Sequence, residues 1–290
     1  MYFTRLIPAF KNHQRKWSDF LYAYPVVSRR ARGVSIGINL SPDKSCNFDC
    51  VYCEVDRQFP EHPRAIHLNI LEYELRNLIE RCQSGKLFLE EPFASVPLPL
   101  RRLNDIAFSG NGEPTMFHSF AEMVDCVARV KQKATDPSVK LVLITNASGL
   151  HRTEVQRGLT IMDANQGEIW AKLDAGTEAY YRKINRAAPP FDRILMNITI
   201  AARERPLCIQ SLFLRIEEDP PSTEELRAYC DRLCEFKSAG CKIKEVQIYT
   251  VARTPREYWA AALSEPELKV IQRMVVQTTG LPVECYTGLT

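Results

Sequence analysis

The sequence predicts an α/β fold in which parallel strands alternate with helices and form an open, partial (β/α)6 barrel. Two observations support this prediction. Short apolar runs rich in β-branched residues recur along the chain, and segments with helical periodicity separate them. This alternation is typical of repeated β-α-β units, because a parallel strand needs a crossover connection to reach its neighbour. In such folds the chemistry gathers beyond the carboxyl ends of the strands.

Six apolar runs are the expected strands. In chain order they are residues 34–40, 104–109, 140–146, 168–173, 207–214 and 243–251. The expected helices lie near residues 69–84, 117–133, 150–158, 177–203, 222–239 and 264–279. Pro189 and Pro190 interrupt the fourth of these, since proline cannot donate the helical hydrogen bond. A short apolar run at 281–287 follows the last helix.

Two helix starts have the spacing of a capping box. Ser222 precedes Glu225 by three residues, and Ser264 precedes Glu267 by the same interval. In this motif the serine side chain and the glutamate side chain each accept from the other residue's backbone N–H. We therefore expect helices to begin directly after Ser222 and Ser264.

Composition excludes several classes of protein. Hydrophobic residues make up 45% of the 290 residues and charged residues 25%, which is ordinary for a globular chain. No apolar run approaches the roughly 20 residues needed to cross a bilayer, and the start of the chain lacks the pattern of a signal peptide. We expect a soluble, cytoplasmic protein that binds no membrane. Ten cysteines in a reducing compartment indicate metal ligands, nucleophiles or buried apolar groups.

The net charge of +3 is unevenly distributed. The first 33 residues hold seven Lys or Arg and one acidic residue, so they carry +6 and the remaining residues carry −3. We expect a basic N-terminal extension over residues 1–33 and a barrel domain over residues 34–290. A basic arm can bind RNA or another anionic partner, and it can equally be a solvated, irregular start.

Three cysteines lie together directly after the first expected strand. Cys46, Cys50 and Cys53 form the pattern C-x3-C-x2-C. Thiolates on one short loop can hold a single metal centre. Structural zinc uses four protein ligands and iron–sulfur cubes usually use four cysteines, so three would leave one iron open for chemistry. Structural zinc and buried thiols without a metal are the alternatives.

The cysteine pattern, with the aromatic Tyr52 before its last cysteine, resembles that of the radical S-adenosylmethionine (SAM) superfamily. The resemblance implies a TIM-like partial barrel and one [4Fe-4S] cluster held by the three cysteines. It implies that SAM chelates the fourth iron and is cleaved reductively to a 5′-deoxyadenosyl radical, which abstracts hydrogen from a substrate. A low-potential electron donor, a flavodoxin or a ferredoxin, is implied as a partner.

A second motif follows the second expected strand. Residues 109–115 read Ser-Gly-Asn-Gly-Glu-Pro-Thr and resemble the Gly-Gly-Glu motif with which the superfamily contacts the SAM amino group. Glycine lets the backbone approach a ligand closely, and a carboxylate suits an ammonium. A plain strand-to-helix turn is the alternative. The residues thus expected to bind SAM are Tyr52, Gly110, Asn111, Gly112, Glu113 and Asn146, although Asn146 also suits a strand-end turn.

Within the superfamily the chain is most similar to the wyosine-synthesis-like Fe–S oxidoreductases, over residues of about 25 to 287. The runs that carry this similarity are residues 28–30, 33–40, 109–115, 143–146, 172–176, 209–214 and 247–253. Wyosine synthases of this type have a second cluster, bound by cysteines upstream of the SAM motif. No cysteine precedes Cys46 here, so we expect one cluster only.

Lys172 and Asp174 are the candidate catalytic residues. Strand alternation places both on one face with Trp170, near the carboxyl end of the fourth expected strand. A buried structural ion pair is the alternative. The resemblance and the basic extension suggest a nucleotide or tRNA base as substrate. Two other functions stay open: activation of a glycyl-radical partner protein, and a non-catalytic metal-binding module.

Overall fold

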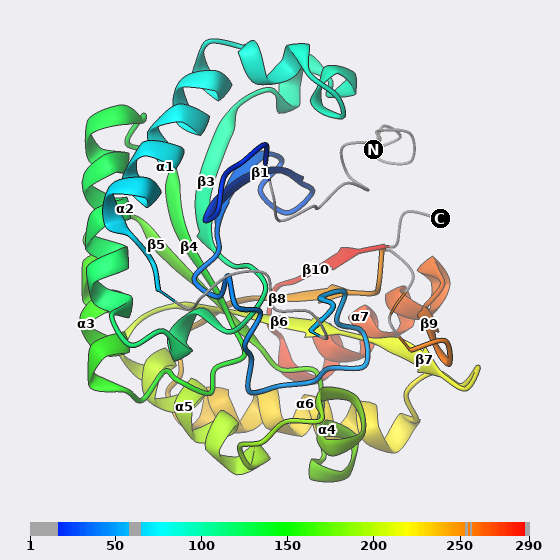
Figure 1. Ribbon diagram of the computed structural model, residues 1–290. Coiled ribbons are helices and arrows are strands. Elements are labelled where there is room, and N and C mark those ends of the chain that lie inside the picture. Colours follow the sequence, from blue (N-terminus) through cyan, green and yellow to red (C-terminus); the bar gives the residue numbers. More distant parts are fainter. Residues whose placement is uncertain (1–16, 58–64, 253–254, 256, 288–290) are drawn as a thin grey trace. The chain divides into compact units, whose positions relative to one another are not determined.

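A computed structural model describes residues 17–57, 65–252, 255 and 257–287 of the chain (Figure 1). These residues fall into two compact units. The first unit contains residues Met1–Cys46, Asp56–Ile144 and Arg152–Glu168, and the second contains Asn47–Val55, Thr145–His151 and Ile169–Thr290. Each unit is described separately below.

The first unit contains four neighbouring strands, in the order β1, β2, β3 and β4. Their bounds are β1 Ala23–Ser28, β2 Gly33–Ile38, β3 Leu103–Phe108 and β4 Lys140–Thr145, whose last residue belongs to the second unit. β1 pairs with β2 in antiparallel orientation, whereas β2, β3 and β4 are parallel. Parallel strands therefore bring the carboxyl ends of β2 and β3 to the same edge.

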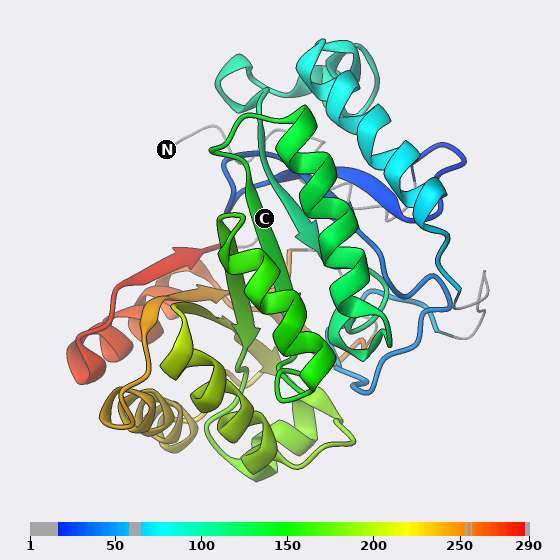
Figure 2. The same ribbon diagram turned by 90° about the vertical axis from the view of Figure 1, so that its left-hand side faces the viewer.

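Three α-helices accompany these strands. They are α1 Leu68–Gln83, α2 Phe120–Ala134 and α3 Thr153–Asp163, and α2 lies beside α3 (Figure 2). The described residues of the unit also form short 3-10 helices: η2 Lys86–Leu89, η3 Phe93–Ser95, η4 Leu98–Leu100 and η5 Pro114–Met116. Apolar residues of α1 and α2 recur at helical spacing and are buried, which is why these segments fold as helices against the sheet.

The second unit has a parallel set of strands in the order β5, β6, β8 and β10. Their bounds are β5 Gly167–Lys172, whose first two residues belong to the first unit, β6 Leu207–Leu212, β8 Ile243–Tyr249 and β10 Val283–Tyr286. A separate antiparallel pair consists of β7 Leu214–Ile216 and β9 Ala260–Ala262. The helices are α4 Glu178–Asn185, α5 Phe191–Glu204, α6 Thr223–Ser238 and α7 Glu265–Thr279.

The six predicted strands and the predicted helices are present within a few residues of their expected bounds, with two differences, at the run 207–214 and at β1. The run 207–214 is two strands, β6 and β7, separated at Phe213, whose N–H donates to the Tyr249 carbonyl. Pro189-Pro190 divides the fourth helical segment into α4 and α5, as expected. β1 was not predicted, and it lies inside the segment expected to be a basic extension.

The division of the chain at residues 33 and 34 stays a prediction. Four of the seven basic residues of the expected extension lie outside the described residues; they are Arg5, Lys11, Arg15 and Lys16. Among the described residues, no helix combines the length and the apolar character that a membrane crossing requires.

The two predicted capping boxes differ. At α7 the box is complete, because Ser264 and Glu267 each accept from the other's backbone N–H. At α6 only half of it forms: Ser222 accepts from the Glu225 N–H, but the Glu225 carboxylate accepts instead from Gly176 N and Thr177 Oγ1, each at 2.5 Å. Glu225 thus fixes the turn that follows β5 rather than the start of its own helix.

Candidate functional site

In the first unit, the segments after β2 and β3 are tied together by Asn39. This buried residue directly follows β2, and its Oδ1 accepts from the N–H groups of Ser41 and Asn111, both at 3.1 Å. Ser41 lies on the segment that leads to Cys46, whereas Asn111 belongs to the predicted SAM-binding turn. One amide oxygen therefore fixes both predicted motifs at the edge where parallel strands end.

The glycines of the predicted SAM-binding turn are required by close approach. A Cβ on Gly112 would overlap the carbonyl oxygen of Ser45, the residue directly before Cys46. A Cβ on Gly110 would overlap the side chain of Asn39. The turn therefore packs its backbone against the start of the cysteine segment, which only glycine permits here.

Glu113 is buried at the end of this turn, and its visible role is local. Its Oε1 accepts from the N–H of Thr115 at 3.1 Å and from the Thr115 hydroxyl at 2.5 Å, which caps the short helix η5. The carboxylate lies where the motif predicts it. Its predicted contact with the SAM amino group stays a prediction.

In the second unit, the cysteine loop is attached to the end of α4. The N–H of Val51 donates to the Ile184 carbonyl at 2.9 Å, and the N–H of Asp49 donates to the Asn185 carbonyl at 3.2 Å. The last carbonyls of a helix have no partner within the helix, so the loop satisfies two of them. Val51 is buried in an apolar cluster that includes Ile184. The backbone on both sides of Cys50 is thereby fixed.

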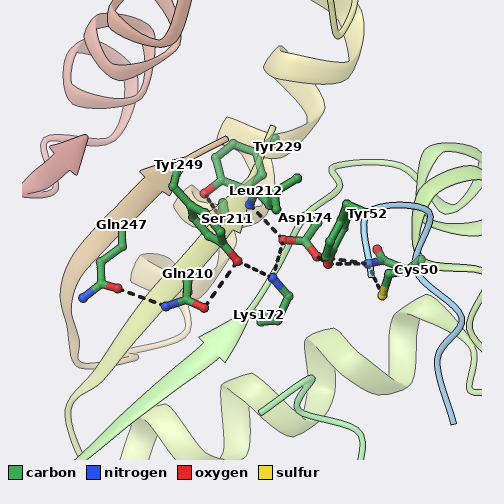
Figure 3. Close-up of polar contacts among 11 residues, drawn as sticks. Cys50, Tyr52, Lys172, Asp174, Gln210, Ser211, Leu212, Tyr229, Gln247 and Tyr249 are labelled. Carbon is green, nitrogen blue, oxygen red and sulfur yellow. Dashed lines mark hydrogen bonds and ion pairs between the residues drawn. The ribbon is translucent and has the colours of Figure 1, made fainter. Parts of the chain in front are cut away.

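A polar network surrounds Cys50 (Figure 3). Its sulfur accepts from Asn185 Nδ2 at 3.5 Å. Burial raises the pKa of the Cys50 thiol to about 12, and the negative charge of Asp174 acts in the same direction. Burial and Asp174 also raise the pKa of Tyr52. A bound metal ion would instead lower the pKa of a coordinating cysteine, since such a thiol is deprotonated outright.

Asp174 is the centre of this network. Its Oδ1 accepts from the N–H of Leu212 at 2.9 Å and lies 3.3 Å from Lys172 Nζ. Its Oδ2 accepts from Asn185 Nδ2 at 2.9 Å and from the hydroxyl of Tyr52. The carboxylate is 3% exposed, so these donors replace water around a buried charge.

Lys172 connects Asp174 to the strands β6 and β8. Its Nζ donates to Tyr249 Oη at 2.7 Å and lies about 5 Å from the ring centroids of Tyr52 (5.0 Å) and Tyr249 (5.2 Å). Burial alone lowers the pKa of Lys172, but the charge of Asp174 and the contact with Tyr249 raise it above its ordinary value. Beyond Tyr249, hydrogen bonds continue to Gln210 and from Gln210 to Gln247 (Figure 3).

The structure thus shows the buried Lys172–Asp174 ion pair that the sequence left open as an alternative to catalysis. A salt bridge of this kind is retained only with good geometry and further hydrogen bonds, and both residues have them. Their catalytic role stays a prediction.

Asn146 fixes the cysteine loop to the end of β4. Its Oδ1 accepts from the N–H and hydroxyl of Ser148, at 3.0 and 2.6 Å, and its Nδ2 donates to Asn47 Oδ1 at 2.9 Å. Asn47 completes the triangle by donating to Ser148 Oγ at 2.9 Å. The strand-end turn expected as an alternative is therefore present, and the predicted contact of Asn146 with SAM stays a prediction.

Sequence reasoning missed the roles of Asn47 and Asn185, and it predicted Glu225 only as a helix cap. The contacts that matter here join residues far apart in the chain: Asn185 lies 135 positions from Cys50, and Glu225 lies 49 positions from Gly176. No local spacing predicts such contacts. The Lys-Leu-Asp-Ala-Gly run was the only indication that this region is constrained.

The donor set suits an iron–sulfur cluster, because soft thiolates select such centres. None of the ten cysteines forms a disulfide in the described part of the chain. Cys46 belongs to the first unit, whereas Cys50 and Cys53 belong to the second. Across the described ranges no group of three His, Cys, Asp or Glu side chains is placed to hold a metal ion.

Sequence relatives of the chain include two UPF0026 proteins. No family model matches the chain. A UPF0026 protein of Helicobacter pylori is 26% identical over 249 residues, which is 84% of this chain and 70% of that protein. A UPF0026 protein of Methanocaldococcus jannaschii is 30% identical over 179 residues, 60% of this chain. The match spans less than half, 46%, of the M. jannaschii protein.

Solved structures that share the fold include TYW1 and SuiB. TYW1 with a lysine-pyruvate adduct bound has a TM-score of 0.51 and 15% identity, over 85% of this chain and 74% of that one. SuiB of Streptococcus suis bound to S-adenosylmethionine has a TM-score of 0.54 and 12% identity, over 89% of this chain and 49% of that one. The likeness to both structures confirms the predicted fold, an open, partial (β/α)6 barrel.

Proposed function

We propose that the chain is a radical SAM enzyme with one [4Fe-4S] cluster, held by Cys46, Cys50 and Cys53. The observation that carries this proposal is the position of the C-x3-C-x2-C motif, which follows β2 in a fold shared with radical SAM enzymes. When bound, the cluster supplies the electron that cleaves SAM. Zinc explains the motif less well, because a structural zinc site needs a fourth protein ligand.

This chain's residues have three tasks in the proposed reaction. Gly110 and Gly112 provide backbone without side chains beside the cysteine segment, and Glu113 provides a carboxylate for the SAM ammonium. Tyr52 and Asn146 are the other proposed SAM contacts. The hydrogen bonds of α4 and Asn146 fix the loop, so that SAM meets a preorganised site.

A nucleotide or tRNA base is the proposed substrate, and a flavodoxin or ferredoxin is the proposed electron donor. The similarity to wyosine-synthesis-like proteins and the basic residues of the N-terminal segment support a nucleic-acid substrate. Electrophoretic shifts with bulk tRNA test it at low salt, where phosphate contacts are strongest. Absence of binding under that condition would contradict this substrate class while leaving the radical chemistry intact.

The radical chemistry itself is tested anaerobically. The protein is reconstituted with iron and sulfide, SAM and dithionite are added, and 5′-deoxyadenosine is measured by chromatography. We expect the wild type to form it and C50A to lose both cluster and product. C234A is the matched control, since Cys234 is also half-buried but lies on α6 outside the motif. A wild-type chain that assembles no cluster under these conditions would refute the proposal.

A further inference from the structure

We propose that Asn185 is a positioning residue for Cys50, and that its side-chain amide sets the reduction potential of the bound cluster. This inference rests on the proposed function, because it concerns a cluster held by Cys50. Asn185 belongs to neither predicted motif. Its contacts reach Cys50 in two independent ways, through the backbone and through the side chain.

The backbone contact comes from the end of α4. The helix stops at Asn185 because Arg186 takes a left-handed conformation, with φ of 45°. The carbonyls of Ile184 and Asn185 then point out of the helix and accept from the N–H groups of Val51 and Asp49. These two N–H groups flank Cys50, so the helix end fixes the backbone on either side of this ligand.

The side-chain contact depends on how the Asn185 amide is oriented. Its Nδ2 lies 2.9 Å from Asp174 Oδ2, and a carboxylate can only accept, so the N–H₂ group and not the amide oxygen faces this side. Asp174 cannot turn away, because the N–H of Leu212 and the ammonium of Lys172 hold its other oxygen. Asp174 therefore ensures that a donor faces Cys50.

The amide has two protons for three acceptors. Besides Asp174, the Tyr52 hydroxyl lies 3.3 Å and the Cys50 sulfur 3.5 Å from Nδ2. The Tyr52 hydroxyl already donates its own proton to Asp174. A cysteine bound to iron is a thiolate, and a charged acceptor attracts a donor more strongly than a phenol oxygen does. With Cys50 as ligand, the second proton of Asn185 is thus directed to the sulfur.

An N–H···S bond of this kind affects reduction in one direction. Adding an electron increases the negative charge on the cluster and its sulfurs, and the amide proton stabilises that charge. Hydrogen bonds to the sulfurs are among the determinants of cluster potential. Removing the donor therefore makes the cluster harder to reduce.

Two substitutions of Asn185 test this inference. N185L keeps the approximate size and removes both amide protons, and N185D is isosteric but replaces the donor by a second carboxylate beside Asp174. N165L is the matched control: Asn165 is also buried, and its amide donates to the Ile161 carbonyl and accepts from Gln132, all within the first unit. Each reconstituted protein is titrated anaerobically without SAM, and reduction is followed by electron paramagnetic resonance.

We expect N185L to lower the equilibrium constant for one-electron reduction about tenfold, which corresponds to about 59 mV. N185D should lower it further because it adds a negative charge, and N165L should leave it unchanged. If N185L does not fold, as judged by circular dichroism, the isosteric N185D decides. Variants that fold but bind no iron, beside an N165L that loads normally, would support the positioning role.

The inference fails if N185L and N185D bind iron as the wild type does and have its potential. That failure is separate from failure of the proposed function. A wild-type chain without a cluster overturns both, whereas a wild type that cleaves SAM beside variants of unchanged potential overturns only the role of Asn185.

Discussion

The protein should lose stability between mildly acidic and neutral pH because of one buried carboxyl, that of Asp105. This residue lies on β3 opposite Ser35 of β2, is 4% exposed, and accepts a hydrogen bond from the Ser35 hydroxyl. Burial raises the pKa of Asp105 from 3.8 to about 6, although the bond from Ser35 acts against this. All of these groups lie in the first unit.

The sign and size of the effect follow from the raised pKa. Below pH 3.8 the carboxyl is protonated in both the folded and the unfolded chain, so burial costs nothing extra. Above pH 6 it is ionised in both states, and folding then includes the cost of burying the charge. A shift of about 2 pH units corresponds to about 3 kcal/mol, of which roughly 2 kcal/mol develops between pH 4.5 and 7.5.

D105N removes this dependence because an amide does not ionise. Urea unfolding at 25 °C, at pH 4.5 and 7.5, gives the free energy of unfolding of both proteins. We expect D105N to gain about 2 kcal/mol relative to the wild type between these pH values. Constant costs of the substitution, such as an imperfectly bonded amide, cancel in this difference. D192N, an exposed aspartate on α5, is the control.

A difference between D105N and the wild type that does not change with pH would refute the reasoning. It would mean that Asp105 is ionised as easily in the folded chain as in the unfolded one. The burial of the carboxylate would then have to be compensated by donors besides the Ser35 hydroxyl.

Two further substitutions test the site. G112A should displace the turn from the Ser45 carbonyl, and we expect weaker SAM binding by isothermal calorimetry and less iron per reconstituted chain, with circular dichroism unchanged. K172M leaves the buried Asp174 without its cation, and because three other donors remain we expect a loss of about 3 kcal/mol in urea unfolding. An unchanged free energy of unfolding in K172M would show that the ion pair adds nothing to stability.

The strands were predictable because most of them are buried on both faces. β2 and β6 are buried at every position, so each appears in the sequence as a mostly apolar run. β1 is different. It pairs only with β2 in the described sheet, contains Pro25, and is followed at once by Arg29 and Arg30. Proline argues against a strand in the interior of a sheet, but an edge strand tolerates it. The sequence of β1 is therefore compatible with its place at the edge.

The cysteine loop was predictable from local spacing, and the residues that hold it were not. The motif is complete within residues 46–53. Asn185 holds the loop only because α4 ends at this residue, and that end depends on the left-handed conformation of Arg186. Glu225 shows the opposite case: its spacing predicts a cap, but the close approach of Gly176 to α6 brings the turn after β5 within reach of its carboxylate. The packing of Gly176 against α6, and not the local spacing, therefore determines the hydrogen-bond partner of Glu225.

Asn146 and Glu113 show why a motif cannot separate ligand binding from loop fixing. Both tasks need a short polar side chain at the carboxyl end of a parallel strand, so one sequence pattern predicts both. In the structure the Asn146 oxygen already accepts two hydrogen bonds from Ser148, and one Glu113 oxygen accepts two from Thr115. A bound SAM would have to share these atoms or replace those bonds. Under the proposed function, breaking these loop bonds would therefore enter the free-energy balance of SAM binding.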